Sequence, residues 1–148
     1  MRLFEKVLFA KPAAIDTIAR FVESWRPGNL HTERAYEGSL YAYLHSCMKD
    51  VQVTRQYAIG RVRTDIMVGD RVLIEIKNDL DTVGKYHRLL GQITDFGDWG
   101  GDMLVVLCGA TDPHLRKQLR HHLQRGLPGA EQEIRLIDKS ADAGSPRR

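Results

Sequence analysis

One stretch of the sequence combines residue types that could support hydrolysis: Asp65, Glu75 and Lys77. Because side chains alternate between the two faces of a strand, Glu75 and Lys77 are expected to share one face. Two neighbouring carboxylates repel each other, and a divalent cation held by both relieves that repulsion. Their hard oxygens favour magnesium or manganese over zinc. Together with a lysine that polarises a water or neutralises a phosphate, such a pair is sufficient to hydrolyse a phosphodiester bond.

These residues can meet only if the chain around them forms a hairpin. Residues 62–68 and 71–77 each alternate between apolar and polar side chains, which is typical of half-buried strands. Gly69 and Asp70 lie between the two segments and favour a turn. The pattern therefore predicts two antiparallel strands that carry the three residues.

The register of the hairpin decides whether the two carboxylates share a face. If Val68 pairs with Val72 across a three-residue loop, Asp65 faces Glu75. A two-residue Gly-Asp turn would instead place Asp65 opposite Ile74 and put the carboxylates on different faces. The first register is favoured because it separates an apolar face from a polar one: Val62, Ile66, Val68, Val72, Ile74 and Ile76 against Arg61, Arg63, Asp65, Glu75 and Lys77.

The rest of the chain supplies the elements that would position this hairpin. Apolar residues recur at helical or strand spacing, and proline, glycine and a capping threonine mark the boundaries. The order α, α, β, β, β, α, β, α, β predicts a three-layer α/β domain with a mixed sheet. The predicted helices cover 12–25, 32–48, 82–99 and 113–125, and the predicted strands cover 51–57, 62–68, 71–77, 103–108 and 133–137.

Length and composition fit one ordinary globular domain. Of the 148 residues, 1–138 are expected to form the domain and 139–148, small and polar, a disordered tail. A net charge of +3 permits nucleic-acid binding without requiring it. Cys47 and Cys108 are expected to be buried thiols in a reducing compartment. With no signal peptide and no apolar run of the roughly 20 residues that span a bilayer, the chain is expected to be cytoplasmic and to have no membrane partner.

Asp65, nine intervening residues and then Glu75-Ile76-Lys77 resemble the PD-(D/E)xK nuclease superfamily, which includes restriction endonucleases, Holliday-junction resolvases and recombination exonucleases. The resemblance extends from Thr32 to Cys108, although Thr64 stands where the family has proline. It implies a restriction-endonuclease-like αβββαβ core, preceded here by an extra helix. It also implies Mg²⁺- or Mn²⁺-dependent cleavage of DNA, with Asp65 and Glu75 as metal ligands and Lys77 beside them.

The family pattern adds candidates on two helices. A glutamate on the helix before the hairpin helps to bind metal, and here Glu33 or Glu37 could serve; we prefer Glu33 as the third metal ligand. Either residue could instead only stabilise the helix N-terminus. Gln92 and Phe96 resemble the Q-x-x-x-Y element of exonuclease-like members, with Phe in place of Tyr. In that interpretation Gln92 orients Lys77 or the attacking water; alternatively it only satisfies backbone groups.

The predicted nucleic-acid contacts are Arg55, Arg61 and Arg63. The basic helix over 113–125 is expected to be a solvated face, with phosphate contact as the alternative. The main alternative to a nuclease is a non-catalytic module of the same fold that binds nucleic acid or protein. A third interpretation, a structural domain with an incidental ion cluster, requires the two carboxylates on opposite faces of the hairpin. Target choice would come from a homodimer, as analogy with junction resolvases suggests, from a partner protein or from DNA shape.

Overall fold

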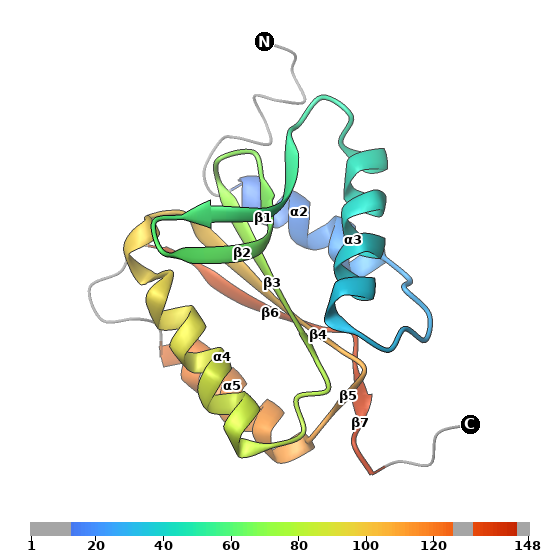
Figure 1. Cartoon of the computed structure of the whole chain (residues 1–148), viewed down its shortest axis with the longest axis vertical. Coiled ribbons are helices and arrows are strands. Elements are labelled where there is room, and N and C mark those ends of the chain that lie inside the picture. Colours follow the sequence, from blue (N-terminus) through green and yellow to red (C-terminus); the bar gives the residue numbers. More distant parts are fainter. Residues whose placement is uncertain (1–12, 126–131, 145–148) are drawn as a thin grey trace.

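The computed structural model describes residues 13–125 and 132–144. This part of the chain forms a five-stranded mixed sheet with helices on both faces (Figure 1). The helices are α2 (Ala13–Ser24), α3 (Glu33–Cys47), α4 (Val83–Asp95) and α5 (Pro113–Arg125), with a short 3₁₀ helix, η1, at Gly97–Trp99. The strands are β1 (Val53–Ile59), β2 (Val62–Val68), β3 (Val72–Asn78), β4 (Asp102–Cys108), β5 (Ala110–Thr111), β6 (Ile134–Asp138) and β7 (Ala141–Asp142).

The sheet has the strand order β1-β2-β3-β4-β6 and changes direction at β3. Strands β1, β2 and β3 are antiparallel, as short turns allow, whereas β3, β4 and β6 are parallel and are joined through α4 and α5. Strand β4 lies between two parallel neighbours, and all seven of its residues are buried. Its continuous apolar run is what a strand covered on both faces requires.

Alternation along the central strands produces two cores, one on each face of the sheet. Ile74 and Ile76 of β3 pack with α2 and α3 in the first cluster. Leu73 of β3 and Val105 of β4 pack with α4 and α5 in the second cluster. Within the described residues, no helix is both long and apolar enough to cross a membrane.

The sequence predicted the order of the four α-helices and of the five strands of the main sheet correctly, but not η1, β5 or β7, and most boundaries lie within two residues of the prediction. The expected α/β class with a mixed sheet is confirmed. Thr32 caps α3 as predicted, because its hydroxyl accepts a hydrogen bond from the backbone N–H of Ala35 at 3.1 Å. The third predicted helix is wrong in extent: α4 ends at Asp95, and η1 and the left-handed Gly100 (φ 83°) follow.

The predicted disordered tail is also wrong for residues 139–144. The N–H of Lys139 donates to the carbonyl of Leu107 at 2.8 Å, and β7 then pairs in parallel with β5. Arg116 of α5 fixes this segment further through ion pairs with Asp138 (2.7 Å) and Asp142 (2.6 Å). Backbone pairing and charge therefore hold a segment whose composition alone predicts disorder; residues 145–148 lie outside the described residues.

Candidate functional site

The hairpin formed by β2 and β3 has the predicted register. Val68 pairs with Val72 and Ile66 pairs with Ile74, so the loop between the strands has three residues. Backbone pairing between β2 and β3 ends at Ile66 and Ile74. Asp65 and Glu75 are the next residues of the two strands, and they face each other where the pairing stops.

Side chains take over the connection between the strands at this point. The N–H of Asp65 donates to Oε1 of Glu75 at 3.1 Å, and the N–H of Ile76 donates to Oδ2 of Asp65 at 2.8 Å. The buried hydroxyl of Thr64 donates to the carbonyl of Ile74 at 3.2 Å. Each carboxylate thus accepts a hydrogen bond from the opposite strand, which fixes the two acids beside each other.

The predicted apolar face of the hairpin is correct except for Val62. Its side chain is half-buried and packs, with Ile59, against the cluster of α4 and α5 rather than against α2 and α3. The physical reason is the interruption of regular pairing near Asp65, beyond which simple alternation no longer assigns β2 residues to a face.

On its other side, β2 also departs from regular pairing at Asp65. Strand β1 pairs Arg55 with Ile66 and Tyr57 with Thr64, and the intervening positions, Gln56 and Asp65, are unpaired. Gln56 has a φ of 51°, a left-handed conformation that costs a non-glycine residue on the order of 1 kcal/mol. The strain lies directly opposite the candidate catalytic aspartate.

Glu37 of α3 lies against this strained position. The residue is only 3% exposed, and Arg55 donates to Oε2 from Nε at 2.9 Å, with Nη2 of Arg55 at 2.8 Å. The side-chain amide of Gln56 donates to Oε1 of Glu37. Glu37 is also close enough to Asp65 to raise the pKa of that carboxyl. Two residues of β1 therefore hold a buried glutamate beside Asp65.

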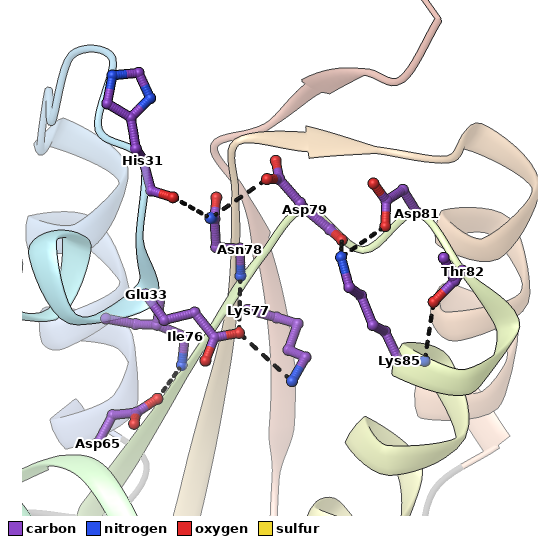
Figure 2. A network of polar contacts seen from close by, with 10 residues as sticks. All are labelled: His31, Glu33, Asp65, Ile76, Lys77, Asn78, Asp79, Asp81, Thr82 and Lys85. Atoms are coloured by element: carbon purple, nitrogen blue, oxygen red, sulfur yellow. Dashed lines mark hydrogen bonds and ion pairs between the residues drawn. The ribbon is translucent and has the colours of Figure 1, made fainter.

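Glu33, one turn earlier on α3, reaches a different part of the site. Its Oε1 accepts a hydrogen bond from the N–H of Asn78 at 3.2 Å and lies 3.5 Å from Nζ of Lys77 (Figure 2). The lysine side chain is only 13% exposed, whereas that of Glu33 is nearly half exposed. Both predicted glutamates thus lie at the site, Glu37 beside Asp65 and Glu33 beside Lys77.

Burial and like charge perturb the two central acids. Burial raises the pKa of Glu75 from an ordinary 4.5 to about 8, and repulsion from Asp65 adds to the shift. Burial also raises the pKa of Asp65 from 3.8 to about 6; the hydrogen bond from Ile76 opposes this shift, and the nearby Glu37 and Glu33 add to it. At neutral pH Glu75 therefore retains a proton, because losing it would leave two buried negative charges side by side.

The donor set fits a hard divalent cation in its chemistry. Asp65, Glu75 and Glu37 provide carboxylate oxygens close together. Because burial and neighbouring acids raise the pKa of Asp65 and of Glu75, a divalent cation that took the place of the bound proton would stabilise their ionised forms. Among residues 13–125 and 132–144, no group of three or more His, Cys, Asp or Glu side chains is already arranged around a common metal position. Asp65 and Glu75 instead direct one oxygen each at a backbone N–H.

Gln92 is not where the sequence analysis placed it. The buried stripe of α4 consists of Tyr86, Leu89 and Ile93, and Phe96 is buried just after the helix. At about 100° per residue, Gln92 falls to one side of this stripe, and its side chain is exposed. No hydrogen bond connects its side chain to any other residue that the structure describes, so the expected inward orientation is corrected.

The predicted phosphate-binding arginines divide into two kinds. Arg55 forms the ion pair with Glu37, and its guanidinium lies 5.8 Å from the centre of the Tyr41 ring. Its charge is thus already compensated by Glu37, and contact of Arg55 with a phosphate stays a prediction. Arg61 and Arg63, near the end of the hairpin formed by β1 and β2, are exposed and make no ion pair with a described residue.

Sequence reasoning missed Gln56 and Asn78, and it noted Thr64 only as a departure from the family pattern that the sequence resembles. Gln56 and Asn78 join the site through contacts between segments 19 and 45 residues apart, which no local pattern encodes. Thr64 carried a usable signal, because a hydroxyl one residue before a candidate catalytic aspartate can bond across the hairpin.

Comparisons with protein-family models, with curated proteins and with solved structures give no significant match to this chain.

Proposed function

We propose that this protein is a metal-dependent nuclease that hydrolyses phosphodiester bonds of DNA. The observation that carries the proposal is the juxtaposition of two largely buried carboxylates, Asp65 and Glu75, with Lys77 two residues further along β3. Burying like charges together is costly, and an ordinary structural ion cluster would place cations between them. A site that tolerates this cost is a candidate for chemistry.

Each residue has a role that follows from its contacts. Asp65 and Glu75 would hold magnesium or manganese, and Glu37 is the better third carboxylate because it lies beside Asp65, whereas Glu33 contacts Lys77. A bound divalent ion would supply a Lewis acid and a water of lowered pKa. Lys77 would orient that water or neutralise charge on the phosphate, with Glu33 restraining its ammonium group.

The arrangement of elements supports the same proposal. The sequence α3, β1, β2, β3, α4, β4 reproduces the αβββαβ order that the resemblance to PD-(D/E)xK nucleases implies. We therefore propose a restriction-endonuclease-like core in which α2 is the additional helix. The exposed Arg61 and Arg63 are the proposed phosphate contacts of the hairpin. Location in the cytoplasm and assembly with a second copy or a partner protein stay predictions.

The test is cleavage of supercoiled, linear and branched DNA with Mg²⁺ or Mn²⁺. Lys77→Ala and Asp65→Ala are each expected to lower the rate at least about a hundredfold, because each removes a group that stabilises developing charge. Asp70→Ala is the matched control, since it removes an exposed aspartate from the turn of the same hairpin. It should cleave like the wild type.

Two results would contradict the proposal. Cleavage that survives in both site variants would place the chemistry elsewhere or in a contaminant. Absence of cleavage, together with absence of calorimetric Mg²⁺ binding that depends on Asp65, would leave the non-catalytic module as the better account. Magnesium binding that requires Asp65, without cleavage of these substrates, would retain the metal site and reject DNA of these forms as the substrate.

A further inference from the structure

The two helical layers of the protein differ strongly in charge. Helices α4 and α5 contain six lysines and arginines and a single acidic residue, Asp95. Helices α2 and α3, on the other face of the sheet, contain two arginines and four acidic residues. Although the net charge of the whole chain is only +3, the layer formed by α4 and α5 is strongly basic.

Most of the positive charge on α4 and α5 is not used to hold the fold. Arg116 is paired with Asp138 and Asp142, and Lys85 is paired with Asp81. The remaining four cations are exposed, and within residues 13–125 and 132–144 their closest ion pair is one of 3.8 Å between Arg120 and Asp138. We refer to these four residues as the basic face: Arg88, Lys117, Arg120 and Arg125.

The other side chains around the basic face indicate which kind of partner it fits. The exposed residues of α5 after its first position are all polar, whereas Leu115 and Leu119 are buried. A helix that lies on a membrane needs an exposed apolar face, and the core of a protein interface is rich in apolar and aromatic residues. Interfaces with nucleic acid are polar and strongly positive. The composition therefore favours a nucleic-acid backbone over a lipid surface or a protein.

The shape of α4 around Arg88 is consistent with close approach by such a partner. Gly84 and Gly91 flank Arg88 at helical spacing, and a Cβ added at either glycine would meet no atom within 4 Å. Glycine in a helix costs roughly 1 kcal/mol relative to alanine, and no packing within the described structure requires it here. The backbone beside Arg88 is thus uncovered.

We propose that the outer face of α4 and α5 binds the phosphate backbone of duplex nucleic acid without reading its sequence. The contacts come from the four residues of the basic face, and each pairs with a phosphate oxygen. Helix α5 has 13 residues and so is about 20 Å long, enough to follow several phosphates along a duplex. This binding requires neither a metal ion nor the acids of the candidate site, so it goes beyond the proposed nuclease.

The experiment measures binding of a short fluorescein-labelled duplex of arbitrary sequence by anisotropy, in EDTA, over a range of KCl concentrations. The wild type is compared with Lys117→Gln/Arg125→Gln. The matched control is Arg20→Gln/Lys49→Gln, which removes the same charge from exposed positions away from α4 and α5. The first variant should bind about tenfold more weakly, and the slope of log K against log salt should fall by about 2, because each lost phosphate contact removes about 0.9. The control should bind within about twofold of the wild type.

Equal weakening of both variants would overturn the proposal, because it would show a general effect of net charge. Absence of duplex binding by the wild type, or an unchanged salt slope in the first variant, would also overturn it. Tighter binding to vesicles of anionic lipid than to the duplex would overturn the proposal as well. Because the assay contains EDTA, a failure of the proposed nuclease leaves this result unaffected, and repeating it with Asp65→Asn separates the two sites.

Discussion

The two halves of the hairpin formed by β2 and β3 are held together in different ways. Near the turn, from Ile66 to Val68 and from Val72 to Ile74, backbone pairing joins strands whose side chains are all buried and apolar. One residue further from the turn, carboxylates and a threonine hydroxyl make the connections instead. The apolar half sets the register, and the register places Asp65 against Glu75. The comparison teaches that the site depends on the turn half, whereas the turn half does not depend on the site.

The strongest test of this asymmetry is Ile74→Ala in the turn half. The side chain of Ile74 is completely buried, so its truncation should lower the free energy of unfolding by about 3 kcal/mol through lost burial and a residual cavity. Urea denaturation measures this loss. Because the site depends on this half, apparent magnesium affinity should fall in step with the loss of folded protein. A decrease of less than about 1 kcal/mol in the free energy of unfolding would mean that the fold does not depend on the apolar packing of the turn half.

A second test addresses the polar half by comparing the stability of Glu75→Gln with that of the wild type as the pH changes. Burial raises the pKa of Glu75 from 4.5 to about 8, so the folded protein binds this proton more tightly than the unfolded chain does. Its contribution is complete below pH 4.5 and is lost as the pH rises to about 8. The variant, which keeps a neutral side chain, should be more stable than the wild type by a few kcal/mol at pH 8 in EDTA, and the difference should vanish near pH 4.

The measurement for this second test is thermal unfolding across that pH range. Glu23→Gln is the control, because Glu23 is exposed on α2. Wild-type and Glu75→Gln stability curves that run parallel from pH 4 to pH 8 would be incompatible with a buried, protonated Glu75. Asp65 contributes in the same direction over a lower interval, since burial raises its pKa from 3.8 to about 6.

The smallest expected effect comes from Thr64→Val, at the boundary between the halves. The substitution keeps the shape of a fully buried side chain and removes the hydroxyl that donates to the carbonyl of Ile74. It should cost about 1 kcal/mol of stability, the usual contribution of a buried hydrogen bond. Chemical denaturation gives the stability, and carboxyl NMR shifts of Asp65 and Glu75 report on the site. Unchanged stability would show that the carboxylates alone connect the two strands in the polar half of the hairpin.

The sequence allowed the turn half to be predicted because its signals are local. Alternation of apolar residues, two turn residues and a capping threonine act within a few positions, and they gave the hairpin register, the start of α3 and the buried strand β4. Helical periodicity also gave the order of the layers. The juxtaposition of Asp65 with Glu75 followed from the register alone.

Other features depend on contacts between distant segments and were missed for that reason. The ion pair between Arg55 and Glu37 joins residues 18 positions apart. The pairing of β7 with β5 in a separate two-stranded sheet is decided by the partner strand, because the composition of residues 139–144 has no strand pattern. The side of α4 on which Gln92 lies was predicted wrongly for another reason. A rotation of about 80° around a helix separates a buried position from an exposed one, and the apolar pattern did not define that angle.

Gly109, between β4 and β5, has a consequence for tracing the ancestry of this chain. It adopts a φ of 69°, and a Cβ there would overlap the side chains of Asn78 and Asp79, which directly follow Lys77. Any larger residue would therefore be strained by the backbone conformation and would have to displace these two side chains. Distant relatives that keep Glu75, Lys77, Asn78 and Asp79 should keep this glycine some thirty residues later. The pairing of that remote glycine with the short acidic motif is a more selective search signature than the motif alone, which many unrelated sequences contain by chance.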